Sequence, residues 1–65
     1  MKNARYTIYR VTRMENGVVK SAEVADCWAY ESLKDARKEC KKKHYSWPYY
    51  YILRINNQGG LMYKP

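Results

Sequence analysis

The stretch that most constrains this 65-residue chain is Pro48–Asn56, which contains three consecutive tyrosines followed by Ile-Leu-Arg-Ile. Aromatic and β-branched side chains favour a pleated, partly covered surface, so the run predicts a strand that Pro48 can begin. The Asn-Asn-Gln-Gly-Gly sequence that ends it tolerates turn conformations. We expect a central strand with Tyr49, Tyr51, Leu53 and Ile55 on its core face. The other face is mixed and carries Tyr50, Ile52, Arg54 and Asn56.

The N-terminal part of the chain predicts a β-hairpin. Residues 5–13 are rich in strand formers, and Val18–Ala25 returns with similar residues. Asn16-Gly17 lies between them, and both residues accept positive φ, which is the strongest short signal for a hairpin turn. Neither face of the first strand is purely apolar, so the pattern does not show which face is buried. Residues 26–31 either extend the second strand or cross the edge of the core.

A helix is expected from Ser32 to Lys43 or His44. Ser32 can accept a hydrogen bond from the first free backbone N–H groups, and Asp35 stands three positions on, close to the capping-box pattern. One side of this helix is a narrow stripe of mostly small residues, suited to close packing on a sheet: Leu33, Ala36, Cys40 and His44. The opposite side is basic: Lys34, Lys38, Lys41 and Lys42.

Leu61–Lys64 follows the Gly-Gly turn and is expected to pair with the central strand as a short last strand. The predicted order is therefore β-β-α-β-β, an α+β fold with one helix on one face of a small antiparallel sheet. Residues 1–65 are expected to form a single domain. A core of this size supplies roughly 3–5 kcal/mol, so a homodimer, a partner chain or a bound polyanion would add needed stability.

Charge and composition limit the function. The chain has 13 basic and 6 acidic residues, a net charge of +7, and eight tyrosines. This positive field favours phosphate backbones, anionic membranes or acidic protein surfaces, although the charge could also serve only solubility. No apolar run reaches the roughly 18 residues of a spanning helix, and no signal-peptide pattern is present. We expect a cytoplasmic protein with no membrane partner.

Catalytic and metal chemistry are not expected. The sequence contains no nucleophile–base pair, phosphate-binding glycine loop or paired carboxylates, so we predict neither an enzyme nor a cofactor. The one metal-like set is Cys27, Cys40 and His44, which falls short of the four ligands of a structural zinc site. A Cys27–Cys40 disulfide is not expected in the cytosol. Both thiols are predicted to be structural.

Basic residues interleaved with aromatic ones are the main functional signal, above all in the Lys-Lys-Lys-His-Tyr-Ser-Trp sequence at positions 41–47. This combination suits phosphate contact together with stacking on exposed bases, and tyrosine and arginine are also enriched in protein interfaces. The alternative is a solvated helix end followed by core aromatics. The candidate residues for binding protein or nucleic acid are Arg10, Arg13, Lys38, Lys41, Lys42, Lys43, Tyr45, Trp47, Tyr50 and Arg54.

The sequence Glu31-Ser32-Leu33-x-x-Ala36-Arg37 follows a hairpin strand with Tyr-x-Ile-Tyr and precedes a further strand and short hairpin. In length, strand order and this helix start, the chain resembles short phage- and prophage-encoded β-β-α-β-β proteins, including some small type I anti-CRISPR proteins. The resemblance implies a non-enzymatic protein that binds and inhibits a nucleic-acid-handling host or defence complex. The partner would then be a host protein or ribonucleoprotein.

A second similarity is to the arm-site DNA-binding domains of phage integrases, which lay a three-stranded sheet in the major groove. Those domains place their helix after three strands, whereas here it follows two. The alternative function is a nucleic-acid-binding module that contacts the phosphate backbone of DNA or RNA through Lys and Arg.

Overall fold

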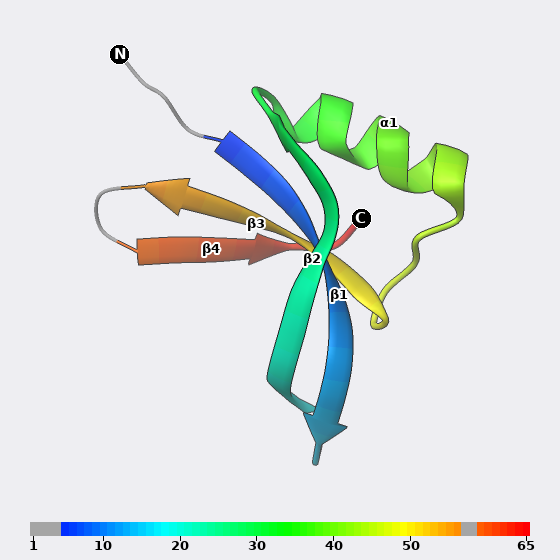
Figure 1. Ribbon diagram of the computed structural model, residues 1–65, viewed down its shortest axis with the longest axis vertical. Coiled ribbons are helices and arrows are strands. Elements are labelled where there is room, and N and C mark those ends of the chain that lie inside the picture. Colours follow the sequence, from blue (N-terminus) through cyan, green and yellow to red (C-terminus); the bar gives the residue numbers. More distant parts are fainter. Residues whose placement is uncertain (1–4, 57–58) are drawn as a thin grey trace.

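The computed structural model describes residues 5–56 and 59–65, with side chains except at positions 27, 28, 55 and 56. In these residues the chain forms, in order, β1 (Arg5–Glu15), β2 (Val18–Tyr30), α1 (Leu33–Lys43), β3 (Tyr50–Asn56) and β4 (Gly59–Tyr63). The strands form one antiparallel sheet with the order β2-β1-β3-β4. Figure 1 shows α1 lying along one face of this sheet. The predicted α+β fold is confirmed.

β3 is an inner strand, paired with β1 on one side and β4 on the other, as the sequence predicts. It begins at Tyr50 and not at Pro48. The reason is a turn in which the amide groups of Tyr49 and Tyr50 both donate to the carbonyl of Ser46, at 3.0 Å each. The Asn-Asn-Gln-Gly-Gly turn lies partly outside the described residues, and Gly59 and Gly60 belong to β4.

The prediction of which face of β3 is the core face was wrong. α1 covers the opposite face, where Ile52 lies across from Ile8 of β1 and both side chains are fully buried. Apolar residues occupy both faces of β3, so alternation alone did not identify the covered side. The register with β1 decides it, because Ile8 and Ile52 stand side by side under the helix. Tyr51, on the face opposite α1, is also only 8% exposed, and its ring stacks on that of Tyr9 in β1.

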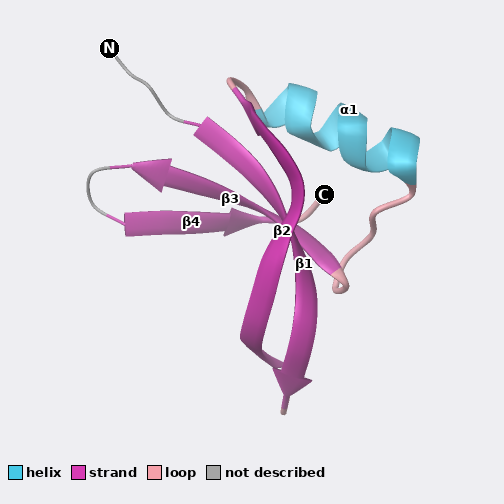
Figure 2. Cartoon of the chain, in the orientation of Figure 1, coloured by secondary structure: helices cyan, strands magenta, loops and turns pink. Residues whose placement is uncertain are grey.

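The predicted β1–β2 hairpin is confirmed, and its far end extends beyond the part of the sheet that α1 covers (Figure 2). Its turn has positive φ at Asn16 (53°) and Gly17 (77°), as a two-residue hairpin turn with the strand twist requires. β2 continues to Tyr30, so the segment after Ala25 extends the strand.

β2 is interrupted by a wide bulge in the middle of its pairing with β1. Thr7 pairs with Ala29 and Tyr9 pairs with Val24, so the single residue Ile8 faces four residues, 25–28, on β2. Extra residues on one strand bend it and redirect its side chains. Here the bend brings Ala25 against the core and Asp26 within reach of α1.

α1 begins and ends as the sequence predicts. The Ser32 hydroxyl accepts the Asp35 amide at 3.1 Å, and the helix ends at Lys43. Of the expected stripe, Ala36 and Cys40 are fully buried and Leu33 is partly buried against them. His44 does not continue the stripe. It adopts the left-handed conformation (φ 62°) that ends the helix, and its side chain is exposed.

Gly17→Ala is expected to destabilise the protein by about 1 kcal/mol, because an L side chain at φ 77° is strained. Nothing lies within 4 Å of the position a Cβ would occupy, so the loss reports backbone conformation and not a clash. Urea denaturation measures the change. The matched control is Asn16→Gly, which retains the turn and should change stability by a few tenths of a kcal/mol at most. Equal effects of the two substitutions would contradict this account.

Candidate nucleic-acid interface

A groove with a volume of about 510 Å³ opens between α1, the loop that follows it and the C-terminal segment. We call it the cationic groove. Its lining combines three basic side chains with two aromatic rings and includes no acidic side chain: Arg37, Lys41, Tyr45, Ser46, Trp47, Lys64 and Pro65. Such a lining offers an anion several positive charges beside apolar, flat surfaces.

The helix supplies two of the charges. Arg37 and Lys41 are four residues apart on α1, so they lie one above the other on the same side. The Nε atom of Arg37 donates a hydrogen bond to the carbonyl of Lys64 at 3.0 Å, which ties the segment after β4 to the helix. This contact brings a third charge, from the other end of the sequence, to the same groove.

The helix terminus positions the first aromatic ring. With His44 in the left-handed conformation, the Tyr45 amide donates to the Cys40 carbonyl at 2.8 Å and the His44 amide to the Lys41 carbonyl at 3.3 Å. This pair of bonds is the Schellman arrangement, which reverses the chain direction at a helix end. The Tyr45 ring then stacks on Tyr50 of β3, with centroids 4.1 Å apart and planes 9° from parallel.

Trp47 supplies the second ring. It lies in the turn closed by the two bonds to the Ser46 carbonyl, which holds its backbone in place. Its side chain remains 42% exposed, and the Nζ atom of Lys64 lies over the ring, 5.6 Å from the centroid. A cation at this distance from an indole is attracted to the face of the ring. The groove therefore places a charge directly beside its most exposed aromatic surface.

The ten candidate residues do not form one site. The groove contains three of them, Lys41, Tyr45 and Trp47, and Tyr50 lies beneath Tyr45 as its stacking partner. The other six lie outside the groove: Arg10, Arg13, Lys38, Lys42, Lys43 and Arg54.

These six basic residues differ in whether an acidic side chain forms an ion pair with them. Arg10 forms an ion pair with Glu23, and the hydrogen bond between the two side chains raises the pKa of the Arg10 guanidinium. Arg13 forms an ion pair with Glu15. Lys38 and Lys42 are exposed on α1, without an ion pair to any described residue. Arg54 lies on the helix-facing side of β3, and its buried Nε has no hydrogen-bond partner within the described part of the chain.

Sequence reasoning missed four groove residues: Arg37, Ser46, Lys64 and Pro65. The i, i+4 spacing of Arg37 and Lys41 on a predicted helix is a signal that could have identified the first. No local pattern identifies Lys64, because it reaches the groove only through the pairing of β4 with β3.

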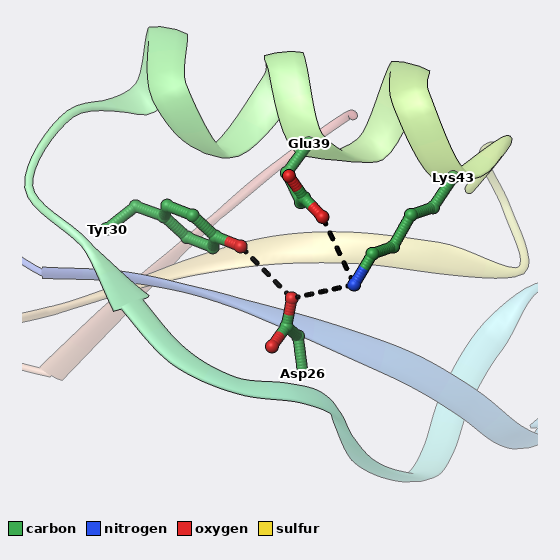
Figure 3. Close-up of polar contacts among 4 residues, drawn as sticks. All are labelled: Asp26, Tyr30, Glu39 and Lys43. Atoms are coloured by element: carbon green, nitrogen blue, oxygen red, sulfur yellow. Dashed lines mark hydrogen bonds and ion pairs between the residues drawn. The ribbon is translucent and has the colours of Figure 1, made fainter.

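Lys43 is paired with two carboxylates in a polar cluster that joins α1 to the bulge of β2, although its side chain stays 43% exposed (Figure 3). Its Nζ lies 3.4 Å from Asp26 Oδ2 and 3.1 Å from Glu39 Oε2, and the Tyr30 hydroxyl donates to Asp26 Oδ2 at 3.0 Å. The Asp26 side chain is only 7% exposed. The hydrogen bonds from Lys43 to Glu39 and Asp26 raise the lysine pKa, and burial followed by the bond to Asp26 raises the pKa of Tyr30 to about 12.

Cys40 and His44, two residues of the predicted metal-like set, differ in exposure. Cys40 is fully buried, and burial raises the pKa of its thiol, whereas His44 is exposed. The Cys27 side chain lies outside the described residues. Among those that are described, no group of three or more His, Cys, Asp or Glu side chains is arranged to hold a metal ion.

In the described part of the chain, no helix has the length and apolar character needed to cross a membrane.

No family model, curated protein or solved structure matches this chain. The resemblance to phage-encoded proteins and the predicted absence of enzymatic activity therefore stay predictions.

Tyr30→Phe is expected to change how stability depends on alkaline pH. Because the folded state raises the pKa of Tyr30 from 10.0 to about 12, it holds the phenol protonated. The resulting stabilisation is complete below pH 10 and is lost as the pH rises from 10 to 12. Removing the hydroxyl should lessen that alkaline loss by about 1–2 kcal/mol, measured by urea denaturation at pH 8, 10 and 11.5.

The control for this experiment is Tyr49→Phe, which alters a tyrosine that is 67% exposed. An unchanged alkaline profile in Tyr30→Phe, or an equal change in both variants, would show that burial and the hydrogen bond to Asp26 do not hold the Tyr30 phenol protonated in this way.

Proposed function

We propose that this protein binds single-stranded nucleic acid in the cationic groove. The observation that carries the proposal is the convergence of Arg37, Lys41 and Lys64 around two aromatic rings, with no acidic side chain in the lining. Phosphate groups provide affinity through basic side chains, and bases of any sequence can stack on aromatic rings.

The arrangement favours a single strand over a duplex. A duplex presents phosphates outward and keeps its bases paired and stacked, so Trp47 would find no free base face. In a single strand, a base next to Trp47 would leave its own phosphate within reach of Lys64, whose Nζ already lies over the indole ring. Lys38 and Lys42, exposed on the same helix, extend the positive surface away from the groove.

The inhibitor hypothesis is a narrower form of this proposal. In it, the strand bound in the groove belongs to a host nucleoprotein complex, and occupying that strand blocks the complex. The net charge of +7 and the resemblance to small phage-encoded proteins support it.

Substitutions in the groove should weaken binding in two separable ways. Lys41→Gln removes one phosphate contact, so the slope of log affinity against log salt should become shallower by about 0.7 for a single strand. Trp47→Ala removes stacking, so affinity should fall by about 1–3 kcal/mol with the salt slope unchanged. Fluorescence anisotropy with labelled oligothymidylate, oligouridylate and a duplex of equal length measures both quantities.

Matched controls lie on the same elements. Lys34→Gln removes an exposed charge of α1 outside the groove, and Tyr49→Ala removes an exposed ring near Trp47. Both should bind almost as the parent protein does. Equal weakening by Lys34→Gln and Lys41→Gln, tighter binding to duplex, or no binding near physiological salt would contradict the proposal.

The inhibitor form predicts recovery of a specific complex from host lysate. The tagged protein should retain the complex without nuclease treatment, and Lys41→Gln combined with Trp47→Ala should lose it. If nuclease leaves the protein components bound and the groove variant recovers them equally well, the complex is held by another surface and this form of the proposal is wrong.

A further inference from the structure

Arg54 is a cation on an inner strand that no carboxylate of the chain neutralises. It lies on the helix-facing side of β3, and its partners in the two flanking strands are Tyr6 of β1 and Leu61 of β4. The side chain is half-buried, and its Nε atom is buried without a hydrogen-bond partner in the described part of the chain. Leu61 beside it is 50% exposed, and Figure 1 shows this end of β3 and β4 extending past α1. The site is therefore open to solvent on one side.

The acidic residues do not compensate this charge. All six lie in the described part of the chain, and none of them forms an ion pair with Arg54. Arg10 and Arg13, the arginines of β1, each have a carboxylate partner instead. The guanidinium of Arg54 also donates no hydrogen bond to a described residue. Its charge and its terminal N–H groups are therefore available to an anion from outside the chain.

The chemistry of the guanidinium indicates the kind of anion. Its planar array of N–H donors matches the oxygen atoms of a phosphate or a carboxylate, often through two parallel hydrogen bonds. Tyr6 and Tyr63 flank β3 on its two sides, and their rings meet edge to face with centroids 6.1 Å apart. An oxyanion beside these rings would be partly removed from water, where the attraction between opposite charges is stronger.

The position of Arg54 continues the cationic groove. Leu61 stands opposite Arg54, and Lys64 of the groove follows Leu61 three residues later in the same segment. At about 3.3 Å per strand residue, these two positions are roughly 10 Å apart. A nucleic-acid strand advances about 3.4 Å per stacked nucleotide, so the separation corresponds to about three nucleotides.

We propose that Arg54 is a second phosphate-binding site, which the strand held in the cationic groove reaches by continuing along β4. The site rests on the strand binding proposed above, because one strand occupies both places. It adds a path and a minimum length to that binding. An oligonucleotide that reaches both sites should bind more tightly than one that fills the groove alone, since the second contact is intramolecular.

Two lengths of oligothymidylate test this site with the full chain. A trinucleotide is too short to span the groove and Arg54, whereas an octanucleotide spans both. Arg54→Gln should make the slope of log affinity against log salt shallower by about 0.7 for the octanucleotide and leave the trinucleotide unchanged. Lys41→Gln should make it shallower for both lengths. Fluorescence anisotropy measures the octanucleotide, and NMR titration measures the weaker trinucleotide.

Two further variants separate charge from position. Arg54→Lys retains the charge and should retain the slope for the octanucleotide. Arg10→Gln removes the same charge from the helix-facing side of β1, but from a residue already paired with Glu23, so it should leave both slopes unchanged.

Unfolding without ligand distinguishes binding from a structural role. Arg54→Met keeps most of the apolar stem and removes a buried donor that has no described partner, so the midpoint of urea denaturation should stay the same or rise. A lower midpoint would show that the chain itself stabilises the guanidinium, and would overturn the site.

The outcomes for the site and for the groove are distinguishable. If Arg54→Gln changes neither length, or changes both equally, the site at Arg54 is wrong, while Lys41→Gln still reports on the groove. A parent chain that binds neither length contradicts both. If Arg54→Gln weakens binding of polyglutamate and not of the octanucleotide, the anion is a carboxylate and the assignment to phosphate is wrong.

Discussion

The whole structure depends on a contact between two small side chains of α1 and two isoleucines of the inner strands. Ala36 and Cys40 lie on Ile8 and Ile52, and all four are fully buried. Larger residues at the helix positions would lift α1 from the sheet, because interiors pack closely and tolerate little extra volume. The tyrosines around this contact cover its margins: Tyr6, Tyr30, Tyr45, Tyr50 and Tyr63.

The bulge in β2 makes a second attachment of the helix. By placing four residues opposite Ile8, it directs Asp26 toward α1, where the carboxylate meets Lys43 and Tyr30. Such partners offset the free-energy cost of burying the carboxylate, so losing one of them is destabilising. The cluster also orients the C-terminal turn of α1, from which the chain reverses at His44 to form one side of the cationic groove.

Charge and apolar surface are separated across the sheet. The groove and the exposed lysines Lys38 and Lys42 lie on the side of α1, whereas Tyr9, Tyr51 and Leu53 lie at the centre of the opposite face of the sheet. These two surfaces suit different partners, since phosphates require cations and apolar faces require other apolar faces.

Much of the fold was predictable from local patterns. The Asn16-Gly17 turn, the Ser32 cap and the strand character of residues 50–55 follow from backbone preferences that act over a few residues. The same is true of the positive charge at the end of α1. Three of the seven groove residues could be predicted for this reason: Lys41, Tyr45 and Trp47 are close in sequence, and the helix end brings them together.

What the tertiary structure alone decided involves residues that are distant in sequence. The face of β3 that is covered depends on its register with β1, because apolar side chains occur on both faces. Lys64 joins the groove through strand pairing and through the hydrogen bond from Arg37 to its carbonyl. The charge of Lys43 is paired because the bulge in β2 brings Asp26, 17 residues earlier in the sequence, within reach of it. Sequence alone determined the elements and the net charge. Long-range packing decided which side chains are buried, which charges remain free and where they meet, because these depend on contacts that no local pattern encodes.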